Sequence, residues 1–375
     1  MSPLASIIVI VRDQASRLAL TLLGLERQDA APGDFEIIVV DDDSGDGGVE
    51  RALRIAGGTS VSIETLTCKS HGCRGIPRNV GAARARGELL VFLDADACPG
   101  RGLVRAHCQS HLRDRSRVAL GDCHVIRGTE RLLDPTDGTP FPSLQGQPLP
   151  DDPQPLVLSR ARFQELGEPG LAAHAEKGIY PGMRRRHELL ETMLSRCSSF
   201  AWAGVVPHNL SLSRATFDAL GGFSTELAHA EGWDLGVRAR SRGYPLTWIP
   251  GARSYHLYHA RSVRERAAVT LRSLDALRSR HPEACVGPLF LWWAAMDGDP
   301  LVPPELRLND PQVLEDACAD RSSRTELEHL FTHYRRARGS LDDWLRGCDL
   351  LVADALRNER EPSRLPDSSS SCGDR

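Results

Sequence analysis

Short apolar runs alternate with longer segments of helical spacing over the first hundred residues. The apolar runs predict strands, at residues 6–11, 35–43, 60–66 and 88–96. The segments between them carry leucines at helical spacing or end on a glycine, and they predict helices at residues 15–28, 49–57 and 76–87. Strands and helices that alternate in this way predict an α/β fold with a mostly parallel central sheet flanked by helices.

Acidic side chains stand where two of these strands end. Asp41, Asp42 and Asp43 close the strand at 35–43, and Asp94 and Asp96 close the strand at 88–96. Ligands of parallel α/β sheets bind beyond the carboxyl ends of the strands, so both acidic groups should face one crevice. Neighbouring carboxylates repel, and burying one without a partner is costly, which predicts a cationic partner at this edge.

The sequence pattern after residue 126 differs from that of the first hundred residues. Residues 127–203 are rich in Pro and Gly and predict long loops that include a helix at 183–196, and such loops often carry substrate contacts. Residues 209–227 predict a helix that stops at Gly221–Gly222, and a strand is expected at 245–250. Helical periods over 261–360 predict an appended α-helical region, followed by a Ser/Pro-rich tail at 361–375 that we expect to be disordered.

Composition narrows the class of protein. With 41% hydrophobic and 26% charged residues, the 375-residue chain is typical of a globular protein, and its net charge of −4 disfavours nucleic acid as a partner. No run reaches the roughly 18–20 apolar residues that span a bilayer, so we expect no membrane-spanning segment. The ten cysteines lack a paired spacing, and the N-terminus lacks the features of a signal peptide. Reduced thiols and a cytoplasmic location are therefore expected.

Six stretches, in order, resemble those of one enzyme family. They are "SIIVIVRD", "FEIIVVDDDSGD", "PRNVGAARARGELLVFLDAD", "NLSLSRATFDALGGF", "EGWDLGVRARSRGY" and "YHLYH", and they cover roughly residues 5–260. The chain thus resembles the family 2 glycosyltransferases, which have the Rossmann-like GT-A fold and use nucleotide-sugar donors. The resemblance implies a donor-binding half at 1–126 and an acceptor-binding and catalytic half at 127–260. The helical region 261–360 and the tail 361–375 would follow them.

The resemblance accounts for the paired carboxylates Asp94 and Asp96. Asp94-Ala95-Asp96 matches the family's Asp-x-Asp motif, in which the first Asp holds the ribose or sugar and the last reaches a divalent metal. A divalent cation neutralises the diphosphate before the sugar leaves, and Mn²⁺ or Mg²⁺ suits oxygen ligands. Related enzymes often place a third metal ligand where His256 stands, with His259 as the competing choice. The metal set implied is Asp94, Asp96 and His256.

Other matched positions are implied to hold the nucleotide. Asp42 aligns with the carboxylate that accepts from the uracil imide, with Asp41 beside it, which favours a UDP-sugar donor. Arg78, Asn79 and Gly81 of "PRNVG" would lie against the nucleotide and its phosphates, at a helix start that favours anions. Arg12 replaces a frequent aromatic residue after the first strand, and both stacking on uracil and pairing with phosphate stay open for it.

The resemblance fails at one position of the catalytic segment. The family's "EDxDLxxR" appears here as "EGWDLGVR", so Glu231 and Asp234 match while Gly232 stands where the Asp that acts as general base should be. Glycine cannot take a proton. Three interpretations follow: Glu231 takes over as base, the acceptor needs little help, or the chain is a donor-binding pseudoenzyme or scaffold. We rank Glu231 first and place Asp234 with it in the catalytic segment.

The acceptor side is less well specified by the sequence. The chain has neither the membrane helices nor the Gln-x-x-Arg-Trp motif of the family's polysaccharide synthases, which favours transfer of a single sugar by inversion. Trp202 and Trp233 are candidates for acceptor contacts. The acceptor itself is unknown and could be a small molecule, a glycan or a peptide. Acceptor binding, homodimer formation and covering of the sheet are all open as roles of residues 261–360.

Overall fold

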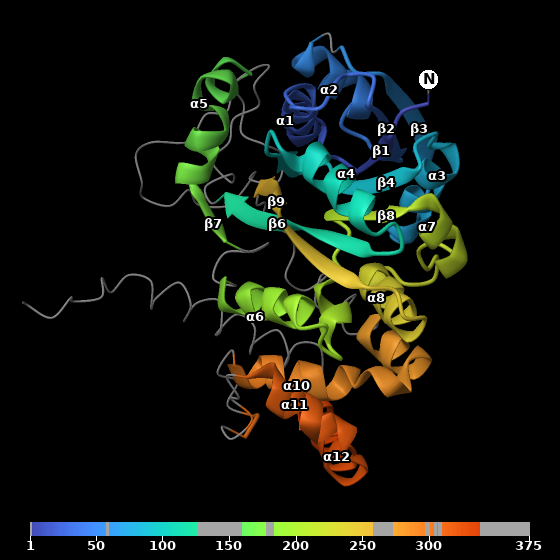
Figure 1. The fold of residues 1–375 in the computed structure, drawn as a ribbon, viewed down its shortest axis with the longest axis vertical. Coiled ribbons are helices and arrows are strands. Elements are labelled where there is room, and N and C mark those ends of the chain that lie inside the picture. Colours follow the sequence, from blue (N-terminus) through green and yellow to red (C-terminus); the bar gives the residue numbers. More distant parts are fainter. Residues whose placement is uncertain are drawn as a thin grey trace, which may run out of the picture.

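The computed structural model describes most of the chain, with gaps. The described residues are 2–57, 60–126, 160–177, 184–257, 273–296, 301–303, 306 and 310–337. A central sheet lies among helices, and a group of C-terminal helices lies below it in the view of Figure 1. No helix among the described residues is both long and apolar enough to cross a membrane.

The N-terminal half is a parallel α/β unit, as its hydrophobic pattern predicts. Its strands are β1 (Ala5–Val11), β2 (Phe35–Asp42), β3 (Ile63–Cys68) and β4 (Leu89–Asp94). Its helices are α1 (Ala15–Glu26), α2 (Gly48–Ala56) and α3 (Gly75–Arg84). The strands lie in the order β3-β2-β1-β4, and all their pairings are parallel. The third strand begins and ends slightly later than the expected 60–66.

The second half extends the same sheet with mixed pairings. Its strands are β5 (Ala97–Pro99), β6 (Val118–Ile126), β7 (Ala175–Lys177), β8 (Asn209–Ser213) and β9 (Leu246–Leu257). The strand order β3-β2-β1-β4-β8-β6-β9-β5 places β8 antiparallel to both β4 and β6, while β9 runs parallel to β6. Strand β5 pairs antiparallel with β9, and β7 with β6. The described sheet has nine strands in all.

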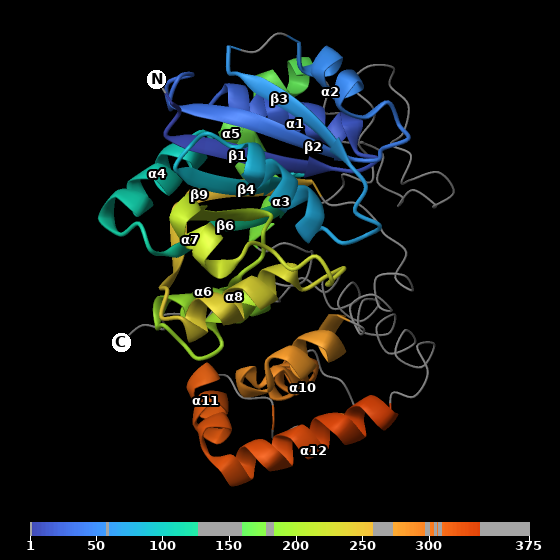
Figure 2. The same ribbon diagram turned by 90° about the vertical axis from the view of Figure 1, so that its right-hand side faces the viewer.

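Helices cover both faces of this sheet and continue beyond it. Those of the second half are α4 (Leu103–Arg113), α5 (Arg160–Ala173), α6 (Arg184–Ser195), the short η3 (Ala201–Gly204), α7 (Arg214–Leu220) and α8 (Glu231–Ser241). The C-terminal region contains η4 (Pro282–Ala284), α10 (Val286–Met296), α11 (Pro311–Ala319) and α12 (Arg321–Ala337). Figure 2 shows α10 to α12 below α6 and α8, on the side away from β1 to β4.

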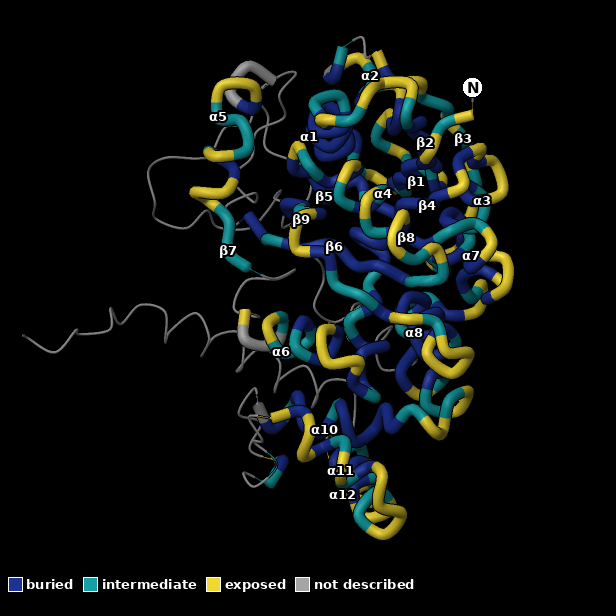
Figure 3. The backbone as a smooth tube through the Cα atoms, viewed as in Figure 1, coloured by how far each residue is buried: buried dark blue, intermediate teal, exposed yellow. Residues whose placement is uncertain are grey.

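The core consists of two main apolar layers, one on each face of the sheet. Ile7 and Val9 of β1 pack with the leucines of α1, whereas Ile8 packs in the layer that contains Trp202 and Leu235. Successive strand residues point to opposite faces, so a strand covered on both sides must be apolar throughout. Figure 3 shows the resulting buried stretches through the strands. This explains why the strand runs were continuous rather than alternating.

The expectation of one helix over residues 209–227 is wrong for its first part. Asn209–Ser213 is strand β8, in which Leu210 and Leu212 are buried in the core. Alternation of apolar and polar residues over "NLSLS" is the period of a strand. The helix begins only after Ser213, whose side-chain oxygen accepts from the backbone N–H of Thr216 and caps α7.

Two further expectations need a correction or fall outside the description. The strand expected at 245–250 runs to Leu257, because residues 250–252 form an irregularity between Ile249, opposite Gly121, and Arg253, opposite Asp122. His256 is therefore inside the strand. Residues 258–272 and 338–375 lie outside the described residues, so the tail at 361–375, His259 and part of the helical region 261–360 stay predictions.

Candidate functional site

The ends of β1, β2 and β4 lie side by side at one edge of the sheet. Val11 is opposite Asp41, and Ile10 is opposite Asp94. Since Arg12 follows directly on Val11, the structure brings one cationic and several acidic residues to the same edge. This is the edge at which ligands of α/β sheets bind.

Asp42 is buried here and is held by Ser70. Its Oδ1 accepts from the Ser70 backbone N–H at 2.7 Å, and the Ser70 hydroxyl donates to Oδ2. The half-exposed Arg12 guanidinium lies 4.0 Å from the same Oδ2. Asp41 accepts from the backbone N–H of Ser44 at 3.0 Å, which fixes the turn after β2. A carboxylate has about four acceptor positions, so Asp42 can still accept from a nucleobase.

A buried arginine joins this edge to helix α8. Arg78 of α3 donates through Nη1 to Glu231 Oε1 at 2.6 Å and through Nη2 to Asp94 Oδ1 at 2.7 Å. Its guanidinium also lies 5.7 Å from the centre of the Phe223 ring. Buried charges persist only when they are paired, and Arg78 pairs both carboxylates at once. The Arg78 triad, meaning Asp94, Arg78 and Glu231, thus brings three sequence-predicted residues together.

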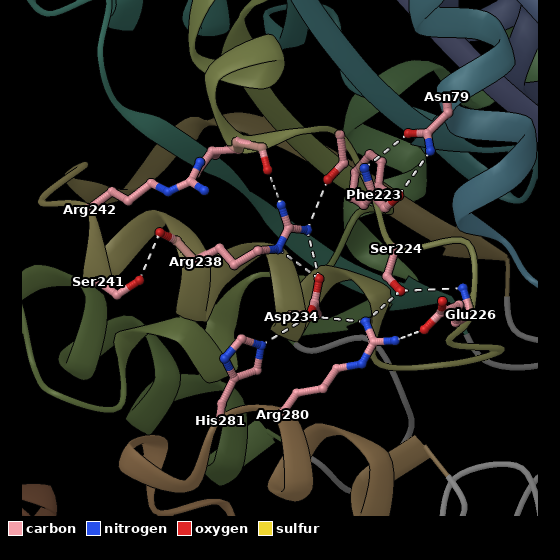
Figure 4. Close-up of polar contacts among 12 residues, drawn as sticks. Asn79, Phe223, Ser224, Glu226, Asp234, Arg238, Ser241, Arg242, Arg280 and His281 are labelled. Atoms are coloured by element: carbon pink, nitrogen blue, oxygen red, sulfur yellow. Dashed lines mark hydrogen bonds and ion pairs between the residues drawn. The ribbon is translucent and has the colours of Figure 1, made fainter.

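Asn79 and Gly81 have clear structural contacts. The Asn79 side-chain amide donates to the Phe223 carbonyl at 2.9 Å and accepts from the Phe223 N–H at 2.9 Å, as Figure 4 shows. A Cβ at Gly81 would lie 2.5 Å from Cγ2 of Ile8, so only glycine lets α3 approach β1 this closely. Both residues lie in the middle of α3, which begins at Gly75, so the expectation that they stand at a helix start is wrong. A role of the two residues in nucleotide binding stays a prediction.

Asp96 and His256 are both buried and face each other. Pairing of β5 with β9 places Ala97 opposite His256, and the Asp96 Oδ2 atom lies 3.5 Å from His256 Nε2. A carboxylate and an imidazole are donors that fit Mn²⁺, while diphosphate and water commonly supply its remaining ligands. Asp94 is turned toward Arg78, and the three residues do not form a group whose ligand atoms all lie within 4.8 Å. The structure therefore brings Asp96 and His256 together but does not gather all three predicted ligands into one close group.

His208, which sequence reasoning missed, lies close to these residues. It is 7% exposed, and among the described residues neither ring nitrogen has a hydrogen-bond partner. Burial lowers the pKa of His208 to about 3, with the charges of Asp94 and Asp96 opposing that shift. A buried imidazole without a partner is costly and is expected where a polar ligand comes close. A single His after a proline carries no sequence signal that could have revealed it.

Packing at the start of α8 explains why position 232 is glycine and not the Asp of the family pattern. Ala230 precedes the helix with a left-handed φ of 69°, and Glu231 is the first helical residue. A Cβ at Gly232 would lie 2.4 Å from the Val205 carbonyl oxygen and 2.6 Å from Cδ of Pro207. No side chain fits there without a shift of this backbone. The segment at 205–207 thus leaves room only for glycine at the position where the family pattern has its Asp.

Asp234 has partners other than those of the triad, although it lies on the same helix. Its Oδ2 accepts from Arg238 Nη2 at 2.6 Å, and its Oδ1 lies 3.0 Å from His281 Nε2. Arg280 is 4.0 Å away, and Arg238 also donates to the Gly222 carbonyl at 2.8 Å. Burial by itself would raise the pKa of Asp234, but the hydrogen bond from His281 and the charge of Arg238 lower it below its ordinary value. We call Asp234, Arg238 and His281 the α8 clasp (Figure 4).

The two candidate acceptor residues belong to an aromatic cluster. Trp202 of η3 is 1% exposed and packs edge-on against Trp233 of α8, with 6.4 Å between ring centres. Trp233 also lies 6.0 Å from Phe290 and 6.0 Å from Trp293 of α10. The cluster joins the sheet domain to the C-terminal helices. Trp202 presents no open face to a ligand here, while Trp233 is only partly buried and stays a candidate.

Known proteins resemble this chain in sequence and in fold. The sequence model described as Glycosyl transferase family 2 matches residues 6–175. Two validoxylamine A glucosyltransferases, from Streptomyces hygroscopicus subsp. limoneus and subsp. jinggangensis, are each 27% identical to this chain over 295 residues, 77% of its length. The matches cover 59% and 63% of those relatives, so the chain spans under two thirds of their length.

A solved structure is similar across almost the whole chain. It is a mannosyltransferase from Pyrobaculum calidifontis in complex with GDP-Man and Mn²⁺, with a TM-score of 0.52 and 15% identity. The similarity covers 96% of this chain and 82% of that one. At this level of identity the match shows the fold, which is the GT-A fold expected from the sequence.

Proposed function

We propose that this chain transfers a single sugar from a nucleotide-sugar to an acceptor hydroxyl with inversion. The premise is that the chain belongs to the glycosyl transferase family 2, whose model matches residues 6–175. The observation that carries the proposal is the Arg78 triad. Arg78 joins Asp94, at the donor edge of the sheet, to Glu231, at the start of α8, by contacts of 2.7 and 2.6 Å. The Arg78 side chain would then hold both Asp94, which lies beside the donor, and Glu231, which accepts the proton.

The donor would be bound at the ends of β1, β2 and β4. Asp42 would accept from the uracil of a UDP-sugar, with Asp41 beside it and Arg12 over the base or a phosphate. Arg78, Asn79 and Gly81, which lie in the middle of α3, would border the nucleotide from the side of that helix. The solved mannosyltransferase that shares this fold carries GDP-Man, so guanine donors belong in the test as well.

Asp96 and His256 would hold a divalent metal, and Asp94 would contact the ribose or sugar of the donor. Mn²⁺ or Mg²⁺ bound there would neutralise charge that develops on the departing diphosphate. Mn²⁺ is the better match to a site that includes an imidazole. The complex of the mannosyltransferase with Mn²⁺ supports this choice. Asp96 and His256 thus serve to position the leaving group.

Glu231 would accept the proton of the acceptor hydroxyl. Arg78 orients Oε1, and among the described contacts Oε2 is left to face the acceptor. As the acceptor oxygen bonds to the anomeric carbon, the bond from that carbon to the diphosphate oxygen breaks, and its electron pair leaves with the diphosphate. Attack from the opposite face inverts the anomeric centre. Asp234 would act as a positioning residue by holding α8 through the clasp.

The relatives suggest where to begin with the substrates. Both are named as glucosyltransferases of validoxylamine A, so UDP-glucose is the first donor and validoxylamine A the first acceptor to try. Trp233 would border the acceptor. Homodimer formation through residues 261–360 and a cytoplasmic location stay predictions from the sequence.

A donor-binding scaffold without catalysis is the second candidate, and Gly232 is the observation that favours it. Nucleotide release separates the two. Purified protein with Mn²⁺ is incubated with a panel of UDP-, GDP- and dTDP-sugars, beside Asp96→Ala and the control Asp218→Ala, whose side chain is exposed on α7. We expect release from one donor, lost in Asp96→Ala and kept in Asp218→Ala. Mn²⁺-dependent UDP binding without release, even when validoxylamine A and other acceptors are supplied, would favour the scaffold.

A further inference from the structure

A second group of metal-ligand side chains lies between α6 and the sheet. His187 and Glu191 are four residues apart on α6, hence on the same face of the helix, and Asp122 stands on β6. One ligand atom from each of these three residues lies within 4.8 Å of the other two. No motif in the sequence marks these residues, because Asp122 is separated from the other two by a long stretch of chain.

Three buried polar atoms of this group lack a partner. Among the described residues, nothing donates to or accepts from Asp122 Oδ1, His187 Nε2 or Glu191 Oε1. Asp122 is 4% exposed and Glu191 is 9% exposed, so solvent does not replace the missing partners. His187 Nε2 is 3.4 Å from Glu191 Oε1 without the geometry of a hydrogen bond. Buried polar atoms without partners are uncommon and call for an explanation, such as an ion.

The other oxygen of each carboxylate is anchored. Asp122 Oδ2 lies 2.9 Å from His124 Nε2 and 3.4 Å from Arg253 Nε, and Glu191 Oε2 accepts from Lys177 Nζ at 2.6 Å. These contacts orient the two carboxylates so that Oδ1 and Oε1 are left for a shared ligand. Metal-binding carboxylates are commonly held in this way by an outer set of hydrogen bonds. Lys177 and Arg253 also balance the two negative charges, which weakens but does not block cation binding.

This group is separate from the residues proposed to hold the donor's metal. In the regular part of the β6–β9 pairing, Asp122 is opposite Arg253 and Val125 is opposite His256. Asp122 and Val125 are three residues apart, and successive residues of a strand point to opposite faces. Asp122 and His256 therefore lie on opposite faces of the sheet.

We propose that Asp122, His187 and Glu191 bind one transition-metal dication, with Zn²⁺ as the preferred ion, at a site independent of the donor's metal. Two carboxylates and one imidazole are a ligand set that Zn²⁺ accepts, with water as a fourth ligand. Burial lowers the pKa of His187 to about 4, so the imidazole is neutral at pH 7. Ligands about 2.1 Å from one ion lie at most roughly 4.2 Å apart, so the group needs to contract only slightly. Mg²⁺, which prefers oxygen ligands alone, should bind less well.

Such an ion would fasten α6 to the sheet. Met193 and Leu194, on the next turn of α6, belong to the same apolar core as Trp202 and Val205. Val205 is the residue whose carbonyl closes the space at Gly232. Binding of the ion would therefore stabilise the segment that shapes the start of α8, and it would do so whether or not the chain transfers a sugar.

Cobalt provides a direct test, because Co²⁺ absorbs visible light when it replaces Zn²⁺. Full-length protein is freed of metal with a chelator and titrated with Co²⁺ in the absence of nucleotide, and Zn²⁺ is then added to displace it. The variants are Glu191→Gln and His187→Gln, which remove ligands, and Asp96→Ala, which removes the donor's metal ligand. Glu188→Gln is the matched control, since Glu188 is exposed on the same helix and pairs with Arg184. Circular dichroism checks that each variant is folded.

We expect one equivalent of Co²⁺ to bind to the wild type, Asp96→Ala and Glu188→Gln, and Zn²⁺ to displace it. Affinity should fall at least tenfold in Glu191→Gln and His187→Gln, and Zn²⁺ should raise the melting temperature of the wild type but not of Glu191→Gln. If the wild type shows no visible absorption from bound Co²⁺, that result alone would overturn the proposal. Unchanged binding in folded Glu191→Gln, or binding lost only in Asp96→Ala, would overturn it as well.

Discussion

Glu231 and Asp234 lie three residues apart on α8 and come from the same short motif, yet the structure gives them different surroundings. Glu231 belongs to the Arg78 triad and faces Asp94 at the donor edge. Asp234 belongs to the α8 clasp and faces Arg238 and His281, on the side of the C-terminal helices. Both of its oxygens are occupied by protein partners. Under the proposed function, Glu231 would act in the chemistry and Asp234 would hold the helix.

The surroundings of Gly232 also explain why this position departs from the family pattern. Gly232 lies between the two carboxylates, and the Val205 carbonyl occupies the space that a side chain would need. The motif here retains the carboxylates on either side of this contact. Glu231 and Asp234 differ in the partner that the fold brings to each. For Glu231 this partner is Arg78, which lies 153 residues earlier in the chain.

Loss of Arg78 should break the triad most severely. Arg78→Met leaves Asp94 and Glu231 as carboxylates without their shared cation, and removing one partner of a buried ion pair costs about 3–5 kcal/mol. We expect that loss in the free energy of unfolding, measured with urea. Arg84→Met, at an exposed ion pair of the same helix, should cost under about 1 kcal/mol. Equal losses in the two variants would contradict a special role of the triad.

Restoring the family's residue at position 232 should harm the protein. Gly232→Asp forces a side chain against the Val205 carbonyl and the Pro207 ring, and overpacking of this kind costs about 1–3 kcal/mol. Gly33→Asp is the control, because a Cβ there meets nothing within 4 Å. We also expect Gly232→Asp to give no activity to a Glu231→Gln variant. A stable double variant with restored turnover would show that the position is free to carry the base.

Loss of the clasp carboxylate should appear as a pH-dependent loss of stability. The folded-state pKa of Asp234 lies below its ordinary value of 3.8, so the ionised form stabilises the fold above that pH and the stabilisation disappears as pH falls through the lowered pKa. We expect Asp234→Asn to cost about 2 kcal/mol near neutral pH, from weakened hydrogen bonds to a charged group. Urea unfolding at several pH values should show the gap to wild type narrowing below pH 3.8. A gap that stays constant would argue against the ionised clasp.

The smallest effect is expected at Ala230, the residue that directly precedes Glu231 and the first turn of α8. A left-handed backbone costs a non-glycine residue about 1–2 kcal/mol, and Ala230 has a φ of 69°. Ala230→Gly removes that cost but adds freedom to the unfolded chain, for a net gain of about 0.5 kcal/mol in stability. Ala83→Gly, in ordinary helix, should instead lose up to about 1 kcal/mol. Thermal unfolding of the two variants side by side tests this difference in sign.

Much of the fold could be predicted from the sequence, because its signals are local. The continuous apolar runs of β1, β2 and β4 follow directly from burial on both faces of the sheet. The sequence predicts helix rather than strand for β8 because its five residues run directly into a helical pattern that begins after Ser213. The full length of β9 was missed because Pro250 and Gly251, ordinary strand breakers, form an irregularity that the strand passes through.

The candidate site could be predicted only in part. Motif positions identified Asp94, Arg78 and Glu231, but nothing local indicated that one guanidinium would pair both carboxylates. His208 and the group of Asp122, His187 and Glu191 went unseen, since their members meet only after folding. The tertiary contacts of Asn79 and Asp234 were likewise invisible in the sequence, which assigns a residue to a motif but does not give its partners.

The central claim is that Glu231, and not Asp234, handles the acceptor proton. The most direct test is the turnover of nucleotide-sugar by Glu231→Gln and Asp234→Asn, with UDP affinity measured for each at a temperature where both are folded. Loss of a general base lowers turnover by about 10²–10⁴-fold, which we predict for Glu231→Gln with nearly unchanged UDP affinity. Asp234→Asn should retain turnover within about tenfold of wild type, as expected for a residue without a part in proton transfer. Wild-type turnover in Glu231→Gln, or the larger loss in Asp234→Asn, would contradict the account.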